Sequence, residues 1–81
     1  MKDLGTYNRL DRTPRQIILI ALDECNTKIT DGYISLYKFT DGLQSCYSVR
    51  HYKKLEHIPK KPQSTYFDVS EILEFNPNKE S

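Results

Sequence analysis

The feature that most constrains the fold is a pair of β-forming runs, residues 33–39 and 43–50, joined through Asp41-Gly42. Asp-Gly is a favoured hairpin dipeptide because tight turns need positive φ, which glycine adopts without steric cost. Alternate side chains of a strand point to opposite faces. The first run therefore divides into Tyr33, Ser35, Tyr37 and Phe39 on one face and Ile34, Leu36 and Lys38 on the other. The sequence predicts a β-hairpin over about residues 33–50.

A helix-start signal lies upstream of this hairpin. Thr13 can cap a helix, Pro14 suits its first position, and Gln16 can close a capping box. The apolar side chains that follow recur at helical spacing: Ile17, Ile18, Ala21, Leu22 and Cys25. We therefore expect a helix of about three turns that ends near Asn26. A buried strand over residues 16–22 is the alternative, because this stretch is rich in β-branched side chains.

The two ends of the chain carry weaker patterns. Residues 1–12 hold few apolar side chains and no clear period, so we expect an extended or frayed arm there. Residues 66–75 alternate as a strand does, and we predict a strand. A helical turn opened by Asp68 is the alternative, because the apolar residues after it also fit helical spacing. Residues 76–81 are expected to be extended or frayed.

A chain of 81 residues is about one small domain. The predicted elements give a single α+β domain over residues 1–81, with an N-terminal helix packed on a small antiparallel sheet. A partly open β-barrel built around the hairpin is the second arrangement that these elements allow.

Three segments carry a resemblance to a known family: the helix from Pro14, residues 34–42 and residues 66–72. In this order they resemble the small Sm-like barrels of bacterial RNA chaperones and of a short inhibitor of a transcription-termination protein. The resemblance implies a small β-barrel with a helix, and it carries over no binding residue. The loop with Pro59 and Pro62 departs from the usual form of such barrels.

Charge is distributed unevenly although the formal net charge is only +1. Residues 1–15 sum to +2, residues 16–49 to −2 and residues 62–81 to −3. The remaining stretch sums to +4, from Arg50, Lys53, Lys54, Lys60 and Lys61 against Glu56. This pattern predicts a basic surface that can meet a polyanion and an acidic surface elsewhere.

The basic stretch predicts contact with single-stranded nucleic acid. Lysine and arginine neutralise phosphates, and tyrosine rings stack on unpaired bases. The candidate nucleic-acid-binding residues are Arg50, Tyr52, Lys53, Lys54, Lys60 and Lys61. We expect a small non-enzymatic binding or regulatory protein.

A protein partner is the competing prediction, and the sequence does not choose between the two. Tyrosine is enriched at interface hot spots, and an acidic strip can imitate a polyanion for a basic partner. The candidate protein-binding residues are Tyr37, Tyr47, Asp68, Glu71 and Glu74, with Glu80 continuing the strip. The chain would then act as an inhibitor or adaptor, for example a phage-type or regulatory protein that occupies its partner's surface.

No complete catalytic, metal or cofactor motif occurs in the sequence. Cys46 and His51, the one nearby thiol and imidazole, are five positions apart and should point to opposite faces of a strand. The longest apolar run, residues 17–22, is far short of the roughly 20 residues that cross a bilayer. The first residues lack the apolar centre of a signal peptide, so we expect a cytoplasmic protein with no membrane contact.

Overall fold

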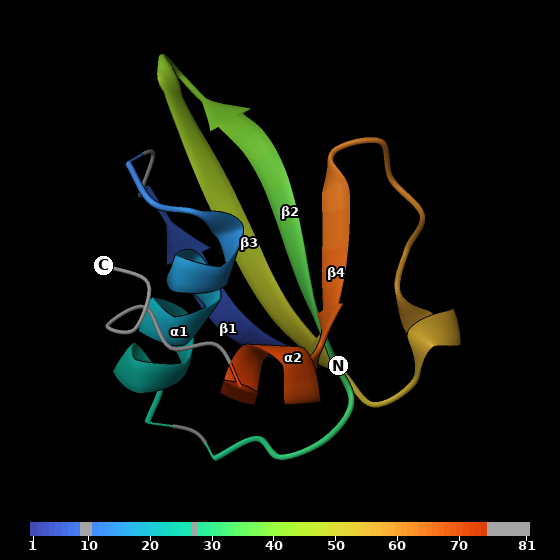
Figure 1. Ribbon diagram of the computed structural model, residues 1–81. Helices are drawn as coiled ribbons and strands as arrows, with labels where there is room; N and C mark the ends of the chain where they lie inside the picture. The colour runs from blue at the N-terminus through green and yellow to red at the C-terminus, as the bar shows by residue number, and fades with distance from the viewer. Residues whose placement is uncertain (9–10, 27, 75–81) are drawn as a thin grey trace.

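The computed structural model describes residues 1–8, 11–26 and 28–74. It contains a four-stranded antiparallel sheet in the order β1-β3-β2-β4 and two short helices, a small α+β fold (Figure 1). The elements in chain order are β1 (Lys2–Tyr7), α1 (Pro14–Glu24), β2 (Tyr33–Asp41), β3 (Gln44–Tyr52), the 3-10 turn η1 (Leu55–His57), β4 (Ser64–Asp68) and α2 (Val69–Glu74). The sheet is open, because in the described residues β1 and β4 each pair with one strand.

The predicted hairpin is confirmed as the centre of the sheet. Strands β2 and β3 pair in continuous register from Tyr33 opposite Tyr52 to Asp41 opposite Gln44. The two turn residues are Gly42 and Leu43 rather than Asp41 and Gly42. Gly42 has a φ of 65°, which places the positive φ at the first turn position, as in a type II′ turn.

The prediction that the helix is the first element is wrong, because β1 precedes it. Residues of the expected arm form this edge strand, which pairs antiparallel with β3. The register shifts between Asp3 and Thr6, and Gly5 has a φ of 104° there, so a bulge interrupts the pairing. Leu4 is fully buried beside the bulge. One buried apolar residue next to a bulge gives little alternation, which is why the strand was missed.

Helix α1 is confirmed, and the strand alternative for residues 16–22 is wrong. Thr13 is its N-cap, and the capping box with Gln16 is complete in both directions. The cap satisfies backbone donors that the helix itself leaves unpaired. At the other end, Asn26 leaves the helical region with a φ of 49°.

The predicted strand over residues 66–75 is wrong beyond Asp68, where β4 gives way to α2. The Asp68 carboxylate accepts hydrogen bonds from the backbone N–H and the hydroxyl of Ser70, each at 2.9 Å. Val69 and Ile72, three residues apart, then bury their side chains completely on one side of the helix. The helix alternative is therefore correct for this stretch, while Phe75 and residues 76–81 lie outside the described residues.

The core lies on one face of the sheet, hereafter the helix face, where α1 and α2 pack (Figure 1). Its fully buried members include Ile17, Ile18 and Ala21 from α1, Val69 and Ile72 from α2, and Leu4, Ile34 and Val49 from the strands. No helix in the described part of the chain is long and apolar enough to span a membrane.

Candidate functional site

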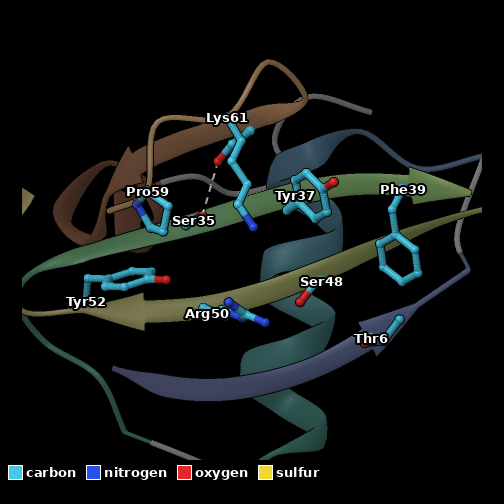
Figure 2. A pocket seen from close by; sticks show the side chains of 10 residues that line it. Thr6, Ser35, Tyr37, Phe39, Ser48, Arg50, Tyr52, Pro59 and Lys61 are labelled. Atoms are coloured by element: carbon cyan, nitrogen blue, oxygen red, sulfur yellow. Dashed lines mark hydrogen bonds between the residues drawn. The ribbon is translucent and has the colours of Figure 1, made fainter. Parts of the chain in front are cut away.

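The opposite face of the sheet, hereafter the open face, carries a hollow of about 300 Å³ (Figure 2). Helices α1 and α2 both pack on the other face of the sheet, where their apolar side chains join the core. We call the hollow on the open face the sheet hollow, and its lining residues are Thr6, Ser35, Tyr37, Phe39, Ser48, Arg50, Tyr52, Pro59, Lys61 and Ser64. Its volume is at the lower end of the roughly 300–1,000 Å³ of small-molecule sites.

Strand register places the lining residues of β2 and β3 together. Ser35 lies opposite Arg50 and Tyr37 lies opposite Ser48, so all four side chains share the open face. The same alternation sends Ile34 to the helix face. The predicted division of the β2 side chains between two faces is therefore confirmed.

The loop between β3 and β4 forms one wall of the sheet hollow. It contributes Pro59 and Lys61, which stand over β2 in Figure 2. Ile58 anchors the loop with an exposed fraction of only 9%. The backbone N–H of Lys38 donates to the Gln63 carbonyl at 3.0 Å, which ties the end of the loop to β2. The wall is thus held by burial and by backbone pairing.

Arg50 provides a cation in the sheet hollow whose side chain has no partner among the described residues. The side chain is partly buried, and its Nε atom is buried without a hydrogen bond to any described residue. Asp3 lies opposite it on β1, but the Asp3 carboxylate accepts from the Gly5 backbone N–H at 2.9 Å. A guanidinium carries five N–H donors, and leaving buried donors unsatisfied is costly. Arg50 is therefore suited to an anionic ligand.

Two aromatic rings and a second cation line the sheet hollow together with Arg50. The Tyr37 and Phe39 rings are 6.0 Å apart between centroids and inclined by 14°. The Lys61 ammonium lies 4.9 Å from the centre of the Tyr37 ring. Aromatic faces next to positive charges favour ligands that combine a flat ring system with an anionic group.

The predicted nucleic-acid-binding residues divide between two places. Arg50, Tyr52 and Lys61 line the sheet hollow. Tyr52 is only 6% exposed, so its ring offers little surface for stacking. The others border a separate open hollow at the end of β3, whose lining residues are Tyr33, Lys53, Lys54, Leu55, Glu56 and Lys60.

The predicted protein-binding residues do not form one surface. Tyr37 is on the open face, whereas Tyr47 lies opposite Lys38 on the helix face and packs against the core. The Ser70 hydrogen bonds hold the pKa of the Asp68 carboxyl below its ordinary value. Glu71 pairs with Arg15, Glu74 is exposed, and Glu80 lies outside the described residues.

Cys46 and His51 lie on opposite faces of β3, as the alternation predicts. The His51 Nε2 atom is 2.8 Å from the Asp31 carbonyl oxygen, away from the thiol. Within residues 1–8, 11–26 and 28–74, no three His, Cys, Asp or Glu side chains gather as metal ligands would.

The lining residues that the sequence analysis did not single out are Thr6, Ser35, Phe39, Ser48, Pro59 and Ser64. Phe39 alternates with Tyr37, so the hairpin pattern already placed it on the right face. Ser64 and Thr6 come from strands whose pairing the sequence did not reveal. No family model, curated protein or solved structure matches the chain. The geometry and chemistry of the sheet hollow therefore carry the functional proposal.

Proposed function

We propose that this protein is a non-enzymatic binding module that holds single-stranded nucleic acid on its open face. The observation that carries the proposal is the Arg50 guanidinium, partly buried in the sheet hollow and unpaired among the described residues. A phosphate is an anion that matches this group, because a guanidinium can donate two parallel hydrogen bonds to it.

The aromatic residues supply the second half of the recognition. Tyr37 and Phe39 line the same hollow as Arg50, so a base near these rings would have its phosphate within reach of the guanidinium. Lys61 adds a second charge above Tyr37. Bases in a duplex have their faces covered by their neighbours, whereas unpaired bases can stack on protein rings. The hollow therefore favours a single strand over a duplex.

The structure gives less support to the inhibitor or adaptor class. Its predicted residues are divided between the two faces, and two of its carboxylates already have partners inside the fold, Asp68 with Ser70 and Glu71 with Arg15. Those two acidic side chains have structural roles. A protein partner is therefore the alternative result that the binding experiment must distinguish.

The test is fluorescence anisotropy with labelled oligo(dT) and oligo(U) of about 12 nucleotides, within the range of about 4–16 covered by a small binding fold. We expect binding that weakens with salt, with a log–log slope near −0.7 for each phosphate contacted. Arg50→Gln should weaken binding at least about tenfold, because a hydrogen bond to a charged group contributes about 1.5–3 kcal/mol.

Lys38→Gln is the matched control. Lys38 is exposed and adjacent to Tyr37 in sequence, but its side chain is on the helix face. This substitution removes the same charge and should leave the affinity nearly unchanged. Absence of binding to either oligonucleotide at low salt would refute the proposal, and a nuclease-resistant stoichiometric complex in a pull-down would then identify a protein partner.

A further inference from the structure

We infer that the bound strand extends beyond the sheet hollow, over the β3–β4 loop, to a second phosphate site formed by Lys53, Lys54 and Lys60. This inference rests on the proposed function and predicts in addition how long a strand the protein binds. The protein would recognise a run of several nucleotides, and a single nucleotide would fill only part of the site.

The second site is the open hollow of about 690 Å³ at the end of β3, hereafter the lysine hollow. Lys53, Lys54 and Lys60 line it and are all exposed. Glu56 is the one carboxylate in this lining, and it forms no ion pair with the three lysines in the described structure. The lysine hollow therefore has a net positive charge that is available to phosphates.

A groove of about 640 Å³ adjoins both hollows. It shares Pro59 and Lys61 with the sheet hollow, and Leu55 and Lys60 with the lysine hollow. A strand that leaves the sheet hollow across Pro59 and Lys61 would therefore enter this groove and reach the lysines at the end of β3. Lys60 and Lys61 line the groove, so positive charge continues along this path.

The groove between the lysines offers apolar and aromatic surface. Its lining includes Leu55, Ile58, Pro62 and Tyr66, and Tyr66 is 52% exposed. The Tyr66 ring meets Tyr33, a residue of the lysine hollow, in an edge-to-face contact with centroids 6.4 Å apart. Aromatic rings and cations therefore both occur along this surface, and proteins that hold single strands combine the two.

The combination of rings and cations favours nucleic acid over an acidic peptide as the occupant. An acidic peptide would use the cations, but its carboxylate side chains carry no flat ring to cover Tyr37, Phe39 and Tyr66. Competition by polyglutamate is the corresponding arm of the test. Polyglutamate should displace the oligonucleotide only at much higher concentration than unlabelled oligo(dT) does.

The experiment measures affinity for oligo(dT) and oligo(U) of about 2, 4, 8 and 12 nucleotides. We expect affinity to rise with length well beyond the dinucleotide. The double variant Lys53→Gln, Lys54→Gln should weaken binding of the longest oligonucleotides roughly tenfold and make the salt slope shallower by about 1.4, since each contact contributes about 0.7. It should leave dinucleotide binding unchanged, whereas Arg50→Gln should weaken binding at every length.

Glu56→Gln should change the affinity in the opposite direction to the lysine double variant. It removes the carboxylate of the lysine hollow and should strengthen binding of the long oligonucleotides alone. Affinity that is the same for two and twelve nucleotides, or a lysine double variant that affects both lengths equally, would overturn the extended site while leaving the sheet hollow intact. Failure of every length to bind would instead overturn the proposed function. Equal competition by polyglutamate would assign the surface to an acidic protein.

Discussion

The two faces of the sheet differ in whether their arginine side chain has a partner within the described residues. On the helix face, Arg15 of α1 pairs with Glu71 of α2 and lies 4.9 Å from the centre of the Phe67 ring. On the open face, the Arg50 side chain has neither a hydrogen bond nor an ion pair within the described residues. The first arginine connects three elements of the fold, and the side chain of the second contacts none of the described residues through a hydrogen bond or ion pair.

The same contrast holds for the neighbours of the two arginines. The helix face of β2 presents Ile34 and Leu36, which are 0% and 3% exposed, whereas its open face presents Tyr37 and Phe39, both partly exposed. Apolar side chains that lose all contact with water stabilise the fold, while exposed rings contribute less to it. One face of β2 therefore stabilises the fold, and the other leaves its rings partly exposed.

The largest expected effect comes from the helix face. Ile34→Ala should lower the free energy of unfolding by about 2–5 kcal/mol, because it removes a fully buried side chain and leaves a cavity under α1 and α2. Urea denaturation followed by circular dichroism measures this change. Any loss of nucleic-acid binding should parallel the loss of folded protein.

Tyr37→Ala should lower oligonucleotide affinity and change stability little, which is the converse of Ile34→Ala. The two variants together test whether the two faces have different roles. Tyr37→Ala removes the ring beside Lys61 and Phe39, so oligonucleotide affinity should fall by about 1–3 kcal/mol, the usual contribution of one stacked base. The urea midpoint should move much less than for Ile34→Ala. If Tyr37→Ala lowers the free energy of unfolding by more than it lowers the free energy of binding, the Tyr37 ring stabilises the fold. The contrast between the two faces would then be wrong.

The sequence predicted these faces because periodicity records which side chains share a face. Tyr37 and Arg50 are on the open face for the same reason that Ile34 is on the other: the hairpin register fixes all three. Helix α1 was predictable because its capping box is local. Strand β1 was missed because pairing with β3 defines it, and pairing between distant segments leaves no local pattern.

The candidate site was predictable only in part. The sequence grouped Arg50, Lys53 and Lys61 by closeness in the chain, but the fold separates Lys53 into the lysine hollow and brings Arg50 to Lys61. The partner rings of the site were not grouped with these cations, because Phe39 is eleven positions away from Arg50. Cross-strand pairing, not sequence distance, decides which residues meet.

Substitutions in the hairpin turn test whether the β2–β3 register determines which side chains lie on each face. Gly42 has a φ of 65° and no atom within 4 Å of the position of an added Cβ, so Gly42→Val would be strained only by its backbone. We expect a loss of about 1–2 kcal/mol in the free energy of unfolding. Leu43→Ser, at the exposed neighbouring position, should have almost no effect. Oligonucleotide affinity should stay unchanged in both, whereas altered affinity would mean that the register had shifted.

The smallest expected effect is a loss of stability at high pH, when Tyr7 on the helix face ionises. The Tyr7 hydroxyl donates to the Leu4 carbonyl at 2.7 Å, and burial, together with the contact to Cys25, raises the pKa of Tyr7 to about 12. A tyrosine in the unfolded chain ionises near pH 10, so the folded state holds its proton longer. The stability from this proton is fully present below pH 10 and is lost as pH rises toward 12.

Tyr7→Phe isolates this contribution. Near neutral pH the variant should be less stable by about 0.5–1.5 kcal/mol, the usual value of one hydrogen bond. Urea denaturation of both proteins at a series of pH values should show this difference constant up to about pH 9 and shrinking above pH 10. A difference that stays constant to pH 11 would show that Tyr7 ionises equally in the folded and unfolded chains. The bulge at Leu4 would then be open to water, and β1 would not close the helix face as the structure describes.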